Sequence, residues 1–185
     1  MSSPAPDHPN SRIYAASSAV AVFLDEEIYA IVGGAALAIL GIVRTGRTTY
    51  ARNILREQKA YFEVEKRTLY THYMSNPPIE IEILTPPMLF PCEFDESTTT
   101  MVVDGIRILH PVLILNSKCR AILGRATDDK KRTDAQDIQF LLSWLKTNAV
   151  QFSWNTVPNA SREFVQWYVS VYNGREYWTN AGYEL

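Results

Sequence analysis

The segment "IYAIVGGAALAIL", residues 28–40, is the feature of this 185-residue chain that most restricts its fold. Residues 28–32 are β-branched, aromatic or small and end at Gly33-Gly34, which predicts a short buried strand. The apolar run after the two glycines predicts a helix that packs closely on that strand. The chain is therefore expected to contain a unit of strand, Gly-Gly and helix.

Further strands are expected after this unit. Alternation in residues 48–55 places Thr49, Ala51 and Asn53 on one face of a predicted strand. Two more candidates, "YFEVE" and "TLYTHY", flank a Lys-Arg turn at residues 66–67. Residues 79–84 alternate strictly, so that Glu80 and Glu82 share one face.

The remaining strands and helices are predicted from turn and capping signals. The favoured two-residue turn Asp104-Gly105 indicates a hairpin in "TTTMVVDGIRIL". A first helix is expected to be capped by Ser11, and another to begin at Pro111 and end near Gly124. "ATDDKKRT", residues 126–133, is expected to be a solvated turn, followed by a helix that begins with a capping box at Thr133. Residues 161–172 predict a last helix.

Strands in the first part and helices in the second indicate an α/β or α+β layer structure. We expect a disordered tail over residues 1–10, one domain over 11–150, and a helical, aromatic C-terminal segment over 151–185 that packs on the same domain. The many rings in "FVQWYVSVYNGREYW" indicate core packing, although a lid or a dimer interface stays open.

Charge and hydropathy exclude several classes of partner. A net charge of −2 argues against a domain built to neutralise nucleic-acid backbones. The apolar run at residues 28–43 is shorter than the roughly 20 residues of a membrane-spanning helix. The N-terminal residues contain no apolar core of a signal peptide, so a cytoplasmic protein is expected. Cys92 and Cys119 fit no metal-ligand spacing.

Two segments resemble the nucleotidyltransferase-like superfamily. "IYAIVGGAALAILGIVRTGRTTYARNI" is similar to the family's strand, Gly-Gly, helix, and Arg-x-Thr-x-Asp-x-Asp on a following strand. "ILHPVLILNSKCRAILGRATDDKKRTDAQDIQFLLSWL" resembles the downstream helices, with Lys118 in one and Asp134-x-x-Asp137 in the next. The resemblance covers about a third of the chain and implies a mixed β-sheet flanked by helices.

The departures from the family pattern concern the metal site. Arg47 and Thr49 occupy the Arg-x-Thr positions, but Ala51 and Asn53 stand where the family has two metal-binding aspartates. Mg²⁺ is normally held by carboxylates, and nucleotidyl transfer requires it to neutralise developing charge. Glu80 or Glu82 can supply only the family's third carboxylate. We therefore expect that the ancestral reaction is lost and that the chain uses neither a metal nor a cofactor.

A cleft of the same shape without its acids suits a small hydrophobic molecule. Such a cleft can hold a flexible molecule in a reactive conformation, while one donor polarises a carbonyl. The predicted function is a metal-independent cyclase or isomerase, of pericyclase type, in specialised metabolism of a fungal kind. The predicted catalytic residues are Arg47, Asn53, Glu82 and His72, and the predicted ligand-binding residues are Gly33, Gly34, Thr49, Ala51, Glu80 and Tyr70.

Other interpretations stay open. The chain can be a non-catalytic, antitoxin-like protein that binds a partner, or a residual Mg²⁺-dependent nucleotidyltransferase that uses Asn53 and the two glutamates. Gly33-Gly34 can serve packing alone, and Glu80 and Glu82 can face solvent. Lys118 and Asp137 are expected to form a structural ion pair rather than a catalytic one. A homodimer also stays open.

Overall fold

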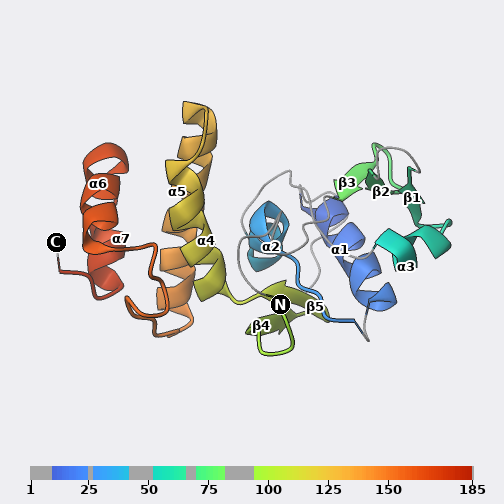
Figure 1. Cartoon of the computed structure of the whole chain (residues 1–185), viewed down its shortest axis with the longest axis horizontal. Helices are drawn as coiled ribbons and strands as arrows, with labels where there is room; N and C mark the ends of the chain where they lie inside the picture. Colours follow the sequence, from blue (N-terminus) through green and yellow to red (C-terminus); the bar gives the residue numbers. More distant parts are fainter. Residues whose placement is uncertain (1–9, 25–26, 42–51, 66–69, 82–93, 185) are drawn as a thin grey trace. The chain divides into compact units, whose positions relative to one another are not determined.

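The computed structural model describes residues 10–24, 27–41, 52–65, 70–81 and 94–184, and of residues 52 and 53 the backbone alone. The chain folds into two compact units, Met1–Leu109 and His110–Leu185 (Figure 1). Residues 150 and 151, where the sequence suggested a boundary, both belong to the second unit. None of the described helices is both long and apolar enough to cross a membrane.

The described residues of the first unit form three helices: α1 (Ser11–Phe23), α2 (Gly33–Leu40) and α3 (Arg52–Glu57). Ile13, Ala16 and Val20 of α1 are buried together, because positions spaced by three or four residues share a helix face. The residue before the helix is Asn10, which is itself buried and donates a hydrogen bond to the carbonyl of Ala38 at 3.1 Å. Residue 10 is therefore anchored on α2, and the expectation that the tail extends to it is wrong.

The described part of the first unit also contains two small antiparallel sheets. The first has the order β1 (Phe62–Val64), β2 (Thr71–Tyr73) and β3 (Ile79–Ile81), and the second is the hairpin of β4 (Thr100–Val103) and β5 (Ile106–Leu109). Asp104 and Gly105 have φ values of 49° and 79°, as a turn with two left-handed residues requires. The predictions of these strands and of the hairpin turn are confirmed.

Two predicted strands differ in the structure. Among residues 28–32, only Ile31 forms a β-bridge, parallel to Ile108. Residues 52–55 belong to α3, so the strand predicted over 48–55 is wrong there, while 48–51 lie outside the described residues. In a run this short, the pattern of polar and apolar residues fits one turn of helix as well as a strand. In the helix, the Leu55 side chain is fully buried. The described residues of these segments therefore do not form one sheet with β3.

The second unit is helical, with α4 (Pro111–Leu123), α5 (Asp128–Thr147), α6 (Arg162–Tyr172) and α7 (Arg175–Asn180). The solvated turn predicted over residues 126–133 is wrong, because α5 already begins at Asp128. Thr127 accepts a hydrogen bond from the Lys130 N–H, and two aspartates in the first turn favour a helix start here. The helix predicted over residues 161–172 is confirmed as α6, but it is not the last one: Gly174 is the N-cap of α7, which the sequence analysis missed.

Candidate functional site

The sheet of β1, β2 and β3 carries three ionisable side chains side by side. Glu63 lies opposite His72 in the register of β1 and β2, and His72 lies opposite Glu80 in that of β2 and β3. Directly opposed residues of antiparallel strands project to the same face, with Cβ atoms about 5 Å apart. We call Glu63, His72 and Glu80 the outer face of this sheet.

The opposite face fixes the direction of these side chains. Phe62, Thr71 and Ile81, one from each strand, are buried. The Phe62 ring contacts Phe23 of α1 at a centroid distance of 6.1 Å. A slip of the register by one residue would expose this apolar set, so the packing of the inner face holds the outer face in place.

The outer face is accessible to solvent and to a ligand. Glu63 is exposed, whereas His72 and Glu80 are half-buried. Tyr70, two residues before His72, is 53% exposed, and its ring centroid lies 6.4 Å from that of the imidazole. A histidine with a carboxylate on each side is suited to accept and return a proton.

The predicted site residues fall into three groups. His72, Glu80 and Tyr70 come together on this sheet. Gly33 and Gly34 form the first turn of α2, where a φ of 63° at Gly33 favours glycine. Arg47, Thr49, Ala51 and Glu82 lie outside the described residues, and of Asn53 the structure describes only its helical backbone. Within the described part of the chain, no group of three or more His, Cys, Asp and Glu side chains is arranged to hold a metal ion.

Glu63 is the residue that the sequence analysis missed. It lies in "YFEVE", which was predicted as a strand, and it alternates with the buried Phe62. Its pairing with His72 depends on the register across the turn between β1 and β2, and the sequence signals did not define that register. A comparison of all possible registers of β1 and β2, with Phe62 and Thr71 required to be buried, would have placed Glu63 opposite His72.

A second cluster of charged side chains joins α4 to α5 in the second unit. The Lys118 Nζ lies 2.6 Å from Asp134 Oδ1 and 2.8 Å from Asp137 Oδ2. The Arg125 Nε lies 2.6 Å from Asp134 Oδ2. We call these four residues the buried ionic cluster, because the side chains of Asp134 and Asp137 are 1% and 0% exposed. The ion pair expected between Lys118 and Asp137 is present.

The protonation of this cluster follows from its contacts. Burial alone would raise the pKa of Asp134, but the hydrogen bonds and charges of Arg125 and Lys118 outweigh it, so the pKa lies below the ordinary value. The hydrogen bond to Asp134 likewise raises the pKa of Arg125. Asp134 is therefore ionised between Arg125 and Lys118, and its contact with Lys118 fixes α5 on α4.

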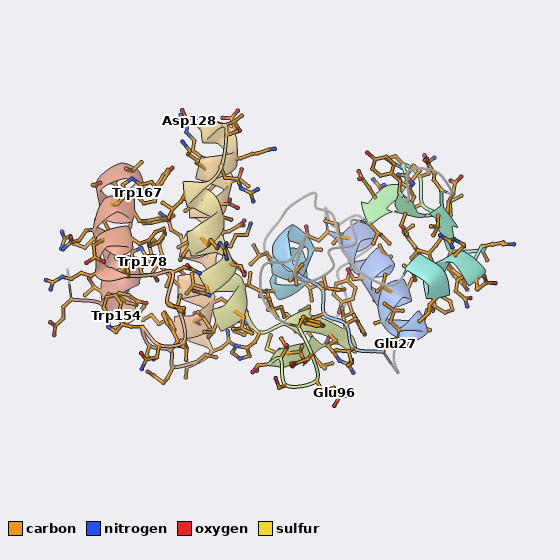
Figure 2. All side chains as sticks on the ribbon, viewed as in Figure 1. Glu27, Glu96, Asp128, Trp154, Trp167 and Trp178 are labelled. Atoms are coloured by element: carbon orange, nitrogen blue, oxygen red, sulfur yellow. The ribbon has the colours of Figure 1, made fainter. Side chains whose placement is uncertain are left out.

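The aromatic C-terminal residues also pack inside the second unit (Figure 2). Trp178 is fully buried, and its ring centroid lies 5.1 Å from that of Tyr183 and 6.2 Å from that of Phe164. Trp154 meets Tyr183 at 4.1 Å. This is the core packing that the density of rings indicated.

Comparison with known proteins identifies the fold. The sequence matches no protein family model and no curated protein. The structure is similar to the crystal structure of an antigenic nucleotidyltransferase-like protein from Paracoccidioides brasiliensis, with a TM-score of 0.68 and 20% sequence identity. The similarity covers 96% of this chain and 95% of that one. The chain therefore has the nucleotidyltransferase-like fold that the sequence predicted.

Proposed function

We propose that this chain, which has a nucleotidyltransferase-like fold, is an isomerase or cyclase that acts on a small apolar molecule without a metal ion. The observation that carries the proposal is the strand register that places His72 between Glu63 and Glu80. This arrangement sets one imidazole, a side chain able to accept and return a proton, between two carboxylates.

The reaction would be a proton transfer within one substrate. His72 removes a proton from a carbon next to a carbonyl, and the imidazolium that forms lies beside the two carboxylates. The Tyr70 hydroxyl donates a hydrogen bond to the carbonyl oxygen, where negative charge develops. In the isomerase reaction, His72 returns the proton to the γ-carbon, which shifts the double bond. In the cyclase reaction, the enolate carbon attacks an electrophilic carbon of the same molecule, and His72 returns the proton to the atom that receives the displaced electron pair. The sequence is redox-neutral and consumes no co-reactant.

The surroundings of the outer face support an apolar substrate. Met74, which directly follows β2 and lies two residues after His72, is 50% exposed. Residues two apart on an extended chain share a face, so Met74 offers apolar surface beside the three ionisable groups. Such a combination suits a molecule whose apolar body is held while one polar group reacts.

The same reasoning argues against nucleotidyl transfer. Ala51 supplies no metal ligand, and Asn53 supplies at most a neutral carbonyl. The backbone at Asn53 is helical, whereas the family pattern places its second aspartate on a strand. Both differences support a reaction that does not use the family's pair of aspartates.

The proposal is tested by proton exchange. The protein is incubated in D₂O with a panel of apolar β,γ-unsaturated carbonyl compounds, and mass spectrometry detects deuterium uptake and isomer formation. His72→Gln should lower the rate at least about 100-fold, and Glu80→Gln about 10-fold, with unchanged unfolding temperatures. Glu57→Gln on α3 is the matched control and should keep full activity.

Three results would contradict this function. They are an absence of exchange with every compound, exchange that His72→Gln leaves unchanged, and a rise in unfolding temperature with a nucleotide only when Mg²⁺ is present. The last result would instead support residual nucleotidyl transfer.

A second candidate function is the binding of a protein partner without catalysis. The observation that favours it is the exposure of Tyr61, Tyr70 and Met74 on or beside one small sheet. Exposed apolar side chains that lie together are typical of interaction surfaces. Partner binding predicts that Tyr70→Ala abolishes complex formation while His72→Gln leaves it intact, the reverse of the order expected for catalysis.

A further inference from the structure

The second unit contains a hollow of about 190 Å³ at the C-terminal ends of α5 and α7. Its apolar wall includes Leu145, Val150 and Phe152, and its polar wall includes Lys146, Gln151 and Asn180. It lies apart in the sequence from every residue of the outer face, so it is not part of the site proposed above.

The two helix ends that form the hollow have the same cap. At α5, the Val150 N–H donates to the carbonyl of Leu145 at 2.9 Å, and the Ala149 N–H donates to that of Lys146 at 3.1 Å. At α7, the N–H groups of Tyr183 and Gly182 make the equivalent bonds to Trp178 and Thr179, both at 3.0 Å. These paired bonds are those of the Schellman motif, and they hold the chain turns that wall the hollow in place before any ligand arrives.

One of the two caps contains a strained residue. The position after the C-cap has a φ of 88° at Gly182, where glycine is favoured, but a φ of 53° at Ala149, where a Cβ is disfavoured. Ala149 lines the hollow. Backbone strain of this kind is common at binding sites, so the strain at Ala149 supports a binding role for this wall of the hollow.

The volume limits the size of the ligand. A cavity of about 150 Å³ in another protein accommodates one benzene molecule. A hollow of about 190 Å³ therefore suits one ring with a substituent of a few atoms. Val150 and Phe152, which are both half-buried, provide the apolar contacts for such a ring.

The charge of the wall decides the kind of substituent. Lys146 is the charged residue among those described around the hollow, and it contributes one positive charge. The C-terminal ends of α5 and α7 each contribute a partial charge of up to about −0.5. These contributions largely cancel, so neither an anion nor a cation is favoured. Lys146, Gln151 and Asn180 can donate hydrogen bonds, and the side-chain carbonyls of the last two can accept them.

We propose that this hollow is a binding site for an uncharged, single-ring molecule whose substituent both donates and accepts hydrogen bonds, as an aryl amide does. Benzamide, benzoate and benzylammonium have nearly the same shape and differ in charge, so they test the proposal directly. Each is titrated into the full chain and followed by NMR chemical shifts. Benzamide should bind with a Kd of about 1 mM or tighter, and at least about fivefold more tightly than either ion.

Two pairs of variants connect binding to the hollow. Asn180→Trp fills it from the exposed end of α7 and should abolish benzamide binding, whereas Thr179→Trp, its exposed neighbour outside the wall, should leave binding unchanged. Lys146→Gln should shift the preference toward benzylammonium, and Lys130→Gln, which removes a charge from the opposite end of α5, should not. Non-saturable shifts, tighter binding of either ion, or unchanged benzamide binding in Asn180→Trp would overturn the proposal.

Discussion

Acidic and basic side chains meet at the outer face and in the buried ionic cluster, and the two places differ in their access to water. On the outer face, Glu63 is exposed and His72 is half-buried. In the buried ionic cluster, Asp134 and Asp137 have almost no exposed surface and lie within 2.8 Å of a cation. Similar residue types therefore stand in opposite environments.

The difference separates a structural role from a chemical one. Charges taken out of water must be paired, so each group of the buried ionic cluster is committed to the others and cannot change its charge without loss of stability. Groups that remain in water can gain and lose protons at little cost to the fold. The family resemblance drew attention to Lys118 and Asp137, yet the pattern of burial places the proposed chemistry on the first unit.

The largest effect is expected where the buried ionic cluster is broken. Lys118→Met removes the cation that contacts both Asp134 and Asp137, and leaves the cluster with an excess of buried negative charge. Removal of one partner from a buried ion pair typically costs about 3–5 kcal/mol of unfolding free energy. Urea denaturation followed by far-UV circular dichroism measures this loss.

The matched control for this variant lies on the surface of α5. Lys131 pairs with Asp128 at 3.5 Å, near the start of the helix (Figure 2). Lys131→Met should change the unfolding free energy by no more than about 0.5 kcal/mol. If Lys118→Met cost as little as Lys131→Met, the distinction between the two clusters would be lost.

A smaller effect is expected from acid. The folded pKa of Asp134 lies below its ordinary value, so its ionisation stabilises the fold above the unfolded pKa of about 3.9. That stabilisation is lost as the pH falls through the folded pKa. The unfolding free energy should therefore decrease below about pH 4, and the decrease should be weaker in Asp134→Asn, which is also less stable at pH 7. An equal slope in both proteins would assign the acid sensitivity to other carboxylates.

The sequence predicted the parts of this fold that depend on local signals. The hairpin at Asp104-Gly105 and the start of α4 at Pro111 were located because turn geometry and proline chemistry act over a few residues. The sequence analysis placed the start of α5 too late because Thr127 and Thr133 can both cap a helix. Which of the two is used depends on how much of the helix is stabilised by contacts with the rest of the second unit. The pairing of His72 with Glu63 was missed because a strand register is set by tertiary packing.

His110 is intermediate between the outer face and the buried ionic cluster, because its side chain is half-buried and accepts a hydrogen bond at the start of its own helix. Its Nδ1 accepts the Val112 N–H at 3.4 Å at the start of α4, and burial lowers its pKa. A lowered folded pKa means that the neutral form stabilises the fold above the unfolded pKa of about 6.5, and that this stabilisation is lost as the pH falls below it. His110→Asn keeps a capping acceptor and should reduce the loss of stability as the pH falls below about 6.5. Thermal unfolding across this range measures the slope, which would remain unchanged if His110 did not contribute to it.

The smallest effect on stability is expected on the outer face, and this result would distinguish it most clearly from the buried ionic cluster. Glu63→Gln, His72→Gln and Glu80→Gln each replace an ionisable side chain that water already solvates in part, so each should change the unfolding free energy by about 0.5 kcal/mol or less. The same urea titrations that detect the loss in Lys118→Met provide the measurement. A loss of several kcal/mol in His72→Gln would mean that His72 is held by the fold as Lys118 is, and the assignment of chemistry to the exposed residues would then be wrong. A small loss of stability together with a large loss of proton exchange would separate function from folding at this one residue.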